Sequence, residues 1–179
     1  MALAEARGKA WKVGDDIPTD YIVPEWMVFK SFAEMAKHAL EIANPQFARS
    51  VRPGDILVAG RHFGCSSGRA VAVKALAATG IGAVVADSFS RTFYRNAFEI
   101  GLPVVEVPGV GARIREGDVV RVDVRRGQVL DESTGEAFAA SPPPPFLLQM
   151  LEAGGIIAMA DRLAAGQVRS SEGGDSHGT

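Results

Sequence analysis

The 179-residue sequence has a single cysteine, Cys65, and only three histidines, at positions 38, 62 and 177. One cysteine cannot form an internal disulfide, and the scattered histidines do not form a zinc-type cluster. The chain alone therefore cannot hold an iron–sulfur cluster. Cys65 could be a nucleophile, but its only nearby base is His62, and no acidic residue in the same stretch would orient that imidazole. We therefore favour a small buried thiol at this position.

Strong charge of one sign and long apolar runs are missing as well. The formal net charge is −2, so there is no basic footprint for nucleic acid. No run approaches the roughly 18 apolar residues of a membrane span, and the first residues lack the apolar stretch of a secretory signal. The sequence as a whole is 47% hydrophobic and 22% charged, which is typical of a globular domain. We expect a cytoplasmic protein that binds neither nucleic acid nor membrane.

Strand and helix patterns alternate from residue 56 to residue 107. Apolar strands are predicted over 56–59, 83–86 and 102–107. The helix that begins at Arg69 is closed by Gly80, and the next helix is closed by Gly101, because glycine takes a left-handed C-terminal conformation at little cost. Strand, helix, strand, helix, strand is typical of an α/β fold with a parallel sheet and right-handed crossovers.

Other elements flank this α/β unit. Residues 117–130 alternate apolar and charged side chains around Arg126-Gly127, which predicts a β-hairpin. A further short strand is expected at 137–138. An opening strand is predicted over 9–14, and Ser31 with Glu34 forms a capping-box pattern for a helix that runs to about Ala43. The last helices are expected over 146–153 and 156–165, and we expect residues 166–179 to be a disordered tail.

The turn after strand 56–59 is the strongest candidate site. It contains Ser66 and Ser67 and leads into the helix that begins at Arg69. Unpaired N–H groups and the positive dipole end of a helix favour an anion, and the Arg69 guanidinium suits a carboxylate. Ser66 and Ser67 would touch the bound anion. The alternative is that one of these serines only caps the helix.

Two segments before the turn need separate interpretations. Asp15, Asp16 and Asp20 lie within six residues, but the segment lacks the calcium-loop pattern. We therefore favour turn-making and hydrogen bonding over a metal site. The next stretch, residues 25–30, is bulky and apolar. It either packs against the domain or serves as a lid or partner surface, because an exposed Trp or Phe is costly unless it is used.

Read together, several stretches resemble the small subunit of isopropylmalate isomerase and the related homoaconitase subunit, the swivelling domain of the aconitase family. The resemblance covers about residues 8–165 and rests on residues 14–20 and 22–24, 36–39, 60–65, 88–91 and 93–96, 101–103, and 151–155. It implies a three-layer β/β/α swivelling domain with a mixed, partly parallel sheet. It also implies a hydro-lyase in which a separate large subunit holds a [4Fe–4S] cluster. Whether the isolated chain self-associates is left open.

The same resemblance implies roles for the turn. The family usually reads Gly-Cys-Gly-Ser-Ser-Arg-Glu-His where this chain has residues 64–71. Aligned without a gap, Ser67 takes the position of the base that removes a proton from carbon, and Arg69 takes the position that binds the substrate carboxylate. Gly68 replaces the second serine, while Ala70 and Val71 replace the Glu-His pair. Ser66 could act only if the turn slipped by one residue.

The resemblance also implies a role for the apolar stretch of residues 25–30, because the corresponding loop of the family lies over the variable arm of a malate-type substrate. Val28 and Phe29 would leave an extra substrate carboxylate desolvated and unpaired, at a cost of about 1–3 kcal/mol. An alkyl arm such as isopropyl or methyl is therefore expected. The alternatives are a homoaconitase or dimethylmalate dehydratase subunit, or a non-catalytic scaffolding subunit with a degenerate turn.

Overall fold

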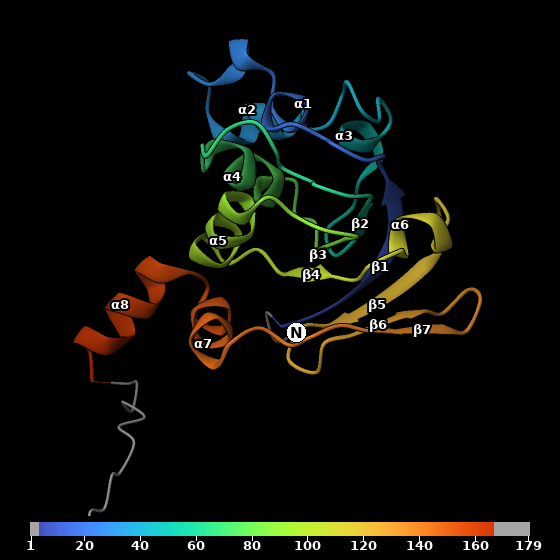
Figure 1. Cartoon of the computed structure of the whole chain (residues 1–179). Helices are drawn as coiled ribbons and strands as arrows, with labels where there is room; N and C mark the ends of the chain where they lie inside the picture. Colours follow the sequence, from blue (N-terminus) through green and yellow to red (C-terminus); the bar gives the residue numbers. More distant parts are fainter. Residues whose placement is uncertain (1–3, 167–179) are drawn as a thin grey trace, which may run out of the picture.

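The protein, described over residues 4–166 by a computed structural model, is built on one seven-stranded sheet (Figure 1). The strand order is β4-β3-β2-β1-β5-β6-β7. The strands are β1 (Glu5–Lys12), β2 (Ile56–Ala59), β3 (Ala83–Ala86), β4 (Val104–Glu106), β5 (Val119–Asp123), β6 (Gln128–Asp131) and β7 (Glu136–Ala139). Strands β1 to β4 pair in parallel, and β1, β5, β6 and β7 pair antiparallel. The predicted parallel unit and the predicted hairpin are both present.

Strand β1 joins the two halves of the sheet. Its residues 5–9 pair antiparallel with β5, while its residues 10–12 pair in parallel with β2. Figure 1 shows α1 to α4 above the parallel strands, α5 beside them, and the antiparallel strands below. This is the predicted three-layer β/β/α arrangement with a mixed sheet. The opening strand is longer than predicted, since it begins at Glu5, and its first half is fixed by β5, a partner more than a hundred residues away.

The helices are mostly short. They are α1 (Thr19–Ile22), the 3-10 helix η1 (Glu25–Met27), α2 (Phe32–Ala36), α3 (Phe47–Ser50), α4 (Val71–Ala78), α5 (Arg91–Ile100), α6 (Val110–Arg113), α7 (Pro145–Ala153) and α8 (Ile156–Ala164). The Ser90 hydroxyl accepts the Phe93 N–H at the start of α5, and Gly101, with φ of 85°, ends it as predicted. None of the helices in the described part is long and apolar enough to cross a membrane.

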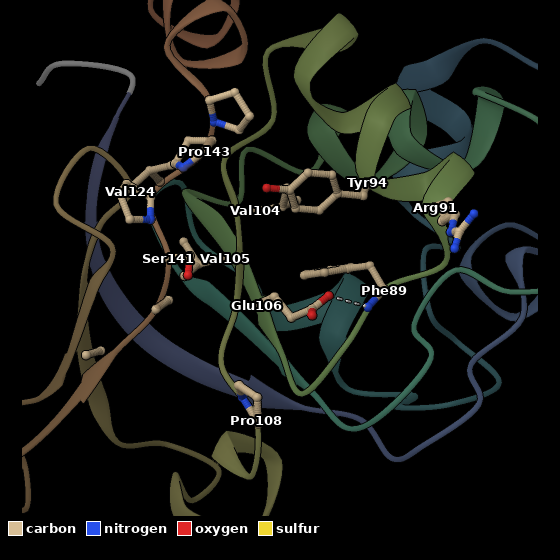
Figure 2. Close-up of a pocket in the computed structure, with 14 residues that line it drawn as sticks. Phe89, Arg91, Tyr94, Val104, Val105, Glu106, Pro108, Val124, Ser141 and Pro143 are labelled. Carbon is tan, nitrogen blue, oxygen red and sulfur yellow. Dashed lines mark hydrogen bonds between the residues drawn. The ribbon is translucent and has the colours of Figure 1, made fainter.

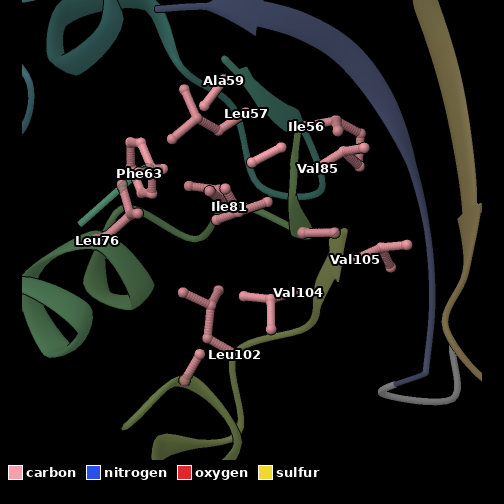
Figure 3. Packing of buried hydrophobic residues seen from close by; sticks show 14 of the residues in the cluster. Ile56, Leu57, Ala59, Phe63, Leu76, Ile81, Val85, Leu102, Val104 and Val105 are labelled. Atoms are coloured by element: carbon pink, nitrogen blue, oxygen red, sulfur yellow. The ribbon is translucent and has the colours of Figure 1, made fainter. Parts of the chain in front are cut away.

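The core lies between the parallel strands and α4 and α5 (Figure 3). Every residue of β2 and β3 is buried, as expected for strands covered on both faces. Phe63, just after β2, is completely buried and makes an edge contact with Phe93 of α5, with ring centroids 5.0 Å apart. The chain that leaves β2 is therefore anchored on a rigid core before it reaches the candidate turn.

The helix expected from Ser31 to about Ala43 is shorter than predicted. The capping box of Ser31 and Glu34 is present, but α2 ends at Ala36 and the chain continues in turns. Leu40 has φ of +58° and its N–H bonds to the Ile22 carbonyl, 3.0 Å away. A buried leucine in a left-handed conformation cannot continue an α-helix. Phe32, the first residue of α2, is 45% exposed.

Smaller differences concern the ends of elements. The strand predicted over 102–107 is β4, Val104–Glu106, and the helix predicted over 146–153 is α7, which begins one residue earlier. The short strand expected at 137–138 is β7, Glu136–Ala139. The predicted disordered tail, apart from residue 166, lies outside the described residues.

Candidate active site

Two segments run side by side at the carboxyl end of β2. Residues 15–20 and 61–69 are joined by a parallel bridge between Pro18 and Cys65. The Ile17 carbonyl accepts the Gly64 N–H at 2.9 Å, and the Cys65 carbonyl accepts the Thr19 N–H at 3.0 Å. These bonds fix the candidate turn against a segment that precedes it by more than 40 residues.

Each carboxylate of the first segment meets a basic side chain of the second. Asp15 pairs with Arg61 at 2.8 Å, Asp16 lies 3.4 Å from the His62 Nδ1, and Asp20 pairs with Arg69 at 2.9 Å. The three carboxylates diverge along the chain instead of converging on one point. In residues 4–166 there is no group of three or more His, Cys, Asp or Glu side chains that could hold a metal ion. Asp15 and Asp20 form hydrogen bonds, as the favoured interpretation predicts, whereas Asp16 only approaches His62.

The pair of Asp15 and Arg61 has a clear electrostatic effect. The Asp15 carboxylate accepts the Arg61 backbone N–H at 2.8 Å and the guanidinium at 2.8 and 3.1 Å. The backbone bond, and then the side-chain bonds, hold the pKa of Asp15 below its ordinary value. The pKa of Arg61 is raised by the same partner. Both groups stay charged at neutral pH, and their hydrogen bonds hold the first residue of the segment 61–69 against Asp15.

The backbone of the turn is tight. His62, Gly64 and Ser66 all have positive φ, at 58°, 75° and 75°. A Cβ on Gly64 would lie 2.4 Å from the buried Phe93 ring, so only glycine fits there. Ser66 in a left-handed conformation costs on the order of 1 kcal/mol or more. The surrounding bonds must hold the turn in this shape, which presents Ser67 inward and Ser66 outward.

The Ser67 oxygen is surrounded by groups that can donate a hydrogen bond, although in the Thr19 contact either hydroxyl can be the donor. It lies 2.9 Å from the Thr19 hydroxyl, 3.2 Å from the Arg69 Nε and 3.4 Å from the Arg69 backbone nitrogen. Ser66 is exposed and its hydroxyl lies 3.4 Å from that of Thr19. Because both Arg69 groups can only donate, the surroundings of Ser67 favour a negatively charged oxygen. Of the two serines, only Ser67 has this arrangement.

Arg69 keeps donors free for a further anion. Its Nε–H points to Ser67, and one Nη2–H points to Asp20. A guanidinium has five N–H donors, so three remain without a partner among the described residues. Their planar arrangement suits one carboxylate. The structure thus brings together Ser67 and Arg69, the residues predicted as base and carboxylate ligand.

Gly68 takes part through its backbone. Its carbonyl accepts a hydrogen bond from the Asn96 side chain of α5 at 3.2 Å. A Cβ on Gly68 would lie 3.1 Å from the Thr92 methyl, so the turn passes close to α5 here. Gly68 has no side chain, so the structure shows only its backbone contact with α5, and its substrate-binding role stays a prediction.

The capping alternative for the serines is wrong. Helix α4 begins at Val71, two residues later than predicted, with Ala70 at its N-cap and no side-chain cap bond. The two serines bond to Thr19 and Arg69 instead. Their hydroxyls are therefore available to the site, and they do not terminate the helix.

The thiol is not arranged as a nucleophile. Cys65 is half-buried, and its backbone forms the bridge to Pro18. His62, its only nearby candidate base, faces Asp16, and no hydrogen bond joins His62 to Cys65 in the described chain. The thiol is less deeply buried than predicted, because the turn it belongs to lies at the surface.

The apolar stretch divides into buried and exposed side chains. Met27 is buried and Val28 is half-buried, but Trp26 is 62% exposed and Phe29 is 97% exposed. Trp26 makes an edge contact with the His38 ring, with centroids 5.2 Å apart. An aromatic ring as exposed as Phe29 favours the lid or partner interpretation over packing against the domain.

Sequence reasoning missed Thr19 and Asp20 as members of the site, and it missed Asn96. All three fall within stretches that carry the family resemblance, 14–20 and 93–96. Their contacts with the turn span 28 to 49 positions, so no local pattern could reveal them.

The fold and the site together define a class of protein, an α/β domain with a mixed sheet that presents a serine and an arginine beyond a buried parallel strand. The family described as aconitase C-terminal domain matches residues 20–108, and the chain belongs to it. More closely, it belongs with the small subunits of 3-isopropylmalate dehydratase.

Individual relatives support this placement. The chain is 46% identical to 3-isopropylmalate dehydratase small subunit 1 of Methanopyrus kandleri, over 87% of this chain and 92% of that one. It is 40% identical to the isopropylmalate/citramalate isomerase small subunit of Methanocaldococcus jannaschii, over 84% and 90%. A crystal structure of 3-isopropylmalate dehydratase from M. jannaschii superposes with a TM-score of 0.85 at 33% identity, covering 91% of this chain and 97% of that one.

Proposed function

We propose that this chain is the small subunit of a heteromeric [4Fe–4S]-dependent hydro-lyase that isomerises an alkyl-substituted malate. The reaction is 3-isopropylmalate to 2-isopropylmalate, by loss and re-addition of water. The observation that carries the proposal is the Ser67 oxygen, which lies within 3.4 Å of the Thr19 hydroxyl and of two Arg69 N–H groups. The names of the relatives supply the reaction class.

Ser67 acts as the base in this proposal. Its ionised oxygen takes a proton from the substrate carbon next to a carboxylate, and the C–H electron pair becomes the C=C bond as hydroxide leaves the neighbouring carbon. Water then adds in the opposite sense, and Ser67 returns the proton. A serine anion is costly in water, but the donors around Ser67 and the removal of water on closure offset that cost.

Arg69 orients the substrate. Its three free N–H donors hold one carboxylate beside Ser67, while the ion pair with Asp20 keeps the guanidinium from turning away. Because Asp20 accepts only one of the five N–H groups, it positions Arg69 without neutralising its binding capacity. Ser66, through its exposed hydroxyl, and Gly68, through its backbone, make further substrate contacts in this proposal.

The cluster belongs to the partner. A [4Fe–4S] cluster needs several thiolates, and this chain has one cysteine, half-buried and part of the turn backbone. In the proposal the large subunit holds the cluster, which supplies the Lewis acid for the departing hydroxyl. This chain supplies the base, the carboxylate ligand and a cover that excludes water.

The substrate arm is proposed to lie against Val28 and Phe29. Neither side chain can pair with a carboxylate, and Phe29 is nearly fully exposed in the chain alone. An alkyl arm would remove apolar surface from water at about 25 cal/mol per Å², whereas a charged arm would lose its hydration. The relative named for both isopropylmalate and citramalate is compatible with isopropyl and methyl arms. Homoaconitase and dimethylmalate dehydratase activities are the alternatives within this class.

The test uses the serine pair as its own control. The chain is co-produced with its large subunit, the cluster is reconstituted anaerobically, and formation of the unsaturated intermediate is followed by absorbance. Ser67→Ala should lower kcat by several orders of magnitude, with KM little changed, whereas Ser66→Ala should lower it far less. If Ser66→Ala is the more damaging change, the assignment of the base is wrong. If neither matters, the chain is a scaffolding subunit.

The substrate assignment has a separate test. Wild type and Val28→Arg are assayed with 3-isopropylmalate and with homocitrate. Wild type should favour isopropylmalate, and Val28→Arg should shift the kcat/KM ratio toward homocitrate by about tenfold or more, because the guanidinium can pair with the added carboxylate. Faster turnover of homocitrate by wild type would overturn the assignment of an alkyl arm.

A further inference from the structure

A cavity of about 640 Å³ lies on the other side of α5 from the candidate active site (Figure 2). It is bounded by the start of α5, by the edge strand β4 and by the segment that follows β7. This volume is within the range of small-molecule sites, about 300–1,000 Å³. No part of the proposed hydro-lyase reaction uses it.

Helix α5 separates the two sites. Thr92 and Asn96 face Gly68 in the active-site turn, whereas Tyr94 lines the cavity. Positions two apart on a helix point about 200° away from each other. The cavity is therefore distinct from the Ser67 site, and a ligand there would not compete with substrate by contact.

Two charged side chains line the cavity, the Glu106 carboxylate and the Arg91 guanidinium. Glu106, at the end of β4, directs its carboxylate toward the backbone nitrogen of Phe89, and in this view the Phe89 side chain lies between Glu106 and the Tyr94 ring (Figure 2). One oxygen accepts the Phe89 N–H at 3.3 Å, and the other has no hydrogen bond within residues 4–166. Arg91 lies at the rim with its guanidinium directed away from Glu106, and the described chain has no ion pair between them. An exposed carboxylate in a concave site attracts a cation.

The remaining walls are apolar or accept hydrogen bonds. Pro142, Pro143 and Pro144 form one wall and carry no backbone N–H. Val104, Val105 and Phe89 form the floor. Burial, and secondly the Glu106 charge, raises the pKa of Tyr94, so its ring keeps a neutral hydroxyl. Acceptors and aromatic faces together suit a positively charged group.

We propose that this cavity binds a small organic cation, a protonated primary amine that carries an apolar arm. The ammonium group lies against the Glu106 carboxylate and the Tyr94 ring. The arm lies along Val104, Val105 and the proline wall. An anion of the same shape would face an unpaired carboxylate and be repelled, and a neutral alcohol would lack the charge-assisted bond.

The test uses three molecules of matched shape: isopentylamine, isopentanol and isovalerate. Each is titrated into the full chain at neutral pH, and the chemical shifts of backbone amides are followed by NMR. The amine should shift the amides of β4 and Tyr94, and should bind at least about tenfold more tightly than the alcohol, with no binding of isovalerate. Added salt should weaken amine binding.

Three variants locate the binding site. Glu106→Gln keeps the shape of an exposed side chain and should weaken amine binding at least about tenfold, while Glu5→Gln removes the same charge outside the cavity and should leave binding unchanged. Tyr94→Leu should also weaken binding. Equal binding of the alcohol, or unchanged binding in Glu106→Gln, overturns the proposal. The measurement needs neither the large subunit nor a malate, so its outcome is independent of the hydro-lyase assignment.

Discussion

Replacing Thr19 by valine would test whether the environment of Ser67 supports an ionised oxygen. Thr19 is 4% exposed, and its hydroxyl makes the shortest contact with Ser67, 2.9 Å, compared with 3.2 and 3.4 Å for the two Arg69 groups. Valine has nearly the shape of threonine but no hydroxyl. The substitution therefore removes one donor from Ser67 and leaves the packing of α1 in place.

The expected effect follows from the charge on the acceptor. A hydrogen bond to a charged group contributes about 1.5–3 kcal/mol, which corresponds to a roughly 10- to 150-fold lower kcat. If Ser67 is ionised only during the reaction, KM should change little and kcat should carry the loss. The kcat–pH profile should move to higher pH, because the anion loses a donor. Folding stability should change by no more than about 1 kcal/mol, since the lost bond joins two neutral hydroxyls in the resting protein.

The assay is turnover of 3-isopropylmalate by the complex with the large subunit, beside urea unfolding of the chain. Thr19→Ser restores the hydroxyl and should recover most of the activity. Thr134→Val is the matched control, since it also removes a hydroxyl, one that accepts the Glu136 N–H at 3.3 Å in a remote turn. Activity of Thr19→Val within twofold of wild type, or Thr19→Ser as poor as Thr19→Val, would refute the donor role.

Three further predictions concern stability and are checked by urea unfolding. Gly64→Ala should destabilise by about 3 kcal/mol or more, because its Cβ would overlap the buried Phe93 ring at a φ of +75°; Gly135→Ala, also at positive φ but in open space, is the control and should cost less. Asp55→Ala should cost roughly 3 kcal/mol, since the carboxylate accepts three N–H groups, including the buried Trp11 indole. The pKa of Asp15 is lowered in the folded state, so the Asp15 carboxylate stabilises the fold at pH values above its ordinary pKa, and this contribution is lost as the pH falls through the lowered pKa. The difference in the free energy of unfolding between wild type and Asp15→Asn should therefore shrink below about pH 4.

The parallel half of the fold could be predicted from local patterns because each element there is defined by its own residues. The strands 56–59 and 83–86 agree with β2 and β3 to the residue, and Gly101 ends α5 in the left-handed conformation that glycine allows. An unbroken run of four apolar residues is typical of a strand covered on both faces, and the aspartate or glycine at each end of the two runs marks where the strand stops.

The features that could not be predicted depend on distant partners. Strand β1 extends to Glu5 because β5 pairs with its first half. The helix after Ser31 stops early because the Leu40 N–H bonds to Ile22, outside the helix. Thr19 enters the active site through a contact with Ser67 that spans 48 positions. In each case tertiary hydrogen bonding overrides local preference.

The family's Glu-His pair is replaced in this chain by Ala70 and Val71. These two positions are the N-cap and first residue of α4, and neither contributes a side-chain bond to the turn. The Ser67 oxygen instead takes its donors from Thr19 and Arg69, and the carboxylate that holds Arg69 is Asp20, on the segment before the turn. The contacts that hold Ser67 and Arg69 in this structure therefore do not depend on the side chains at positions 70 and 71.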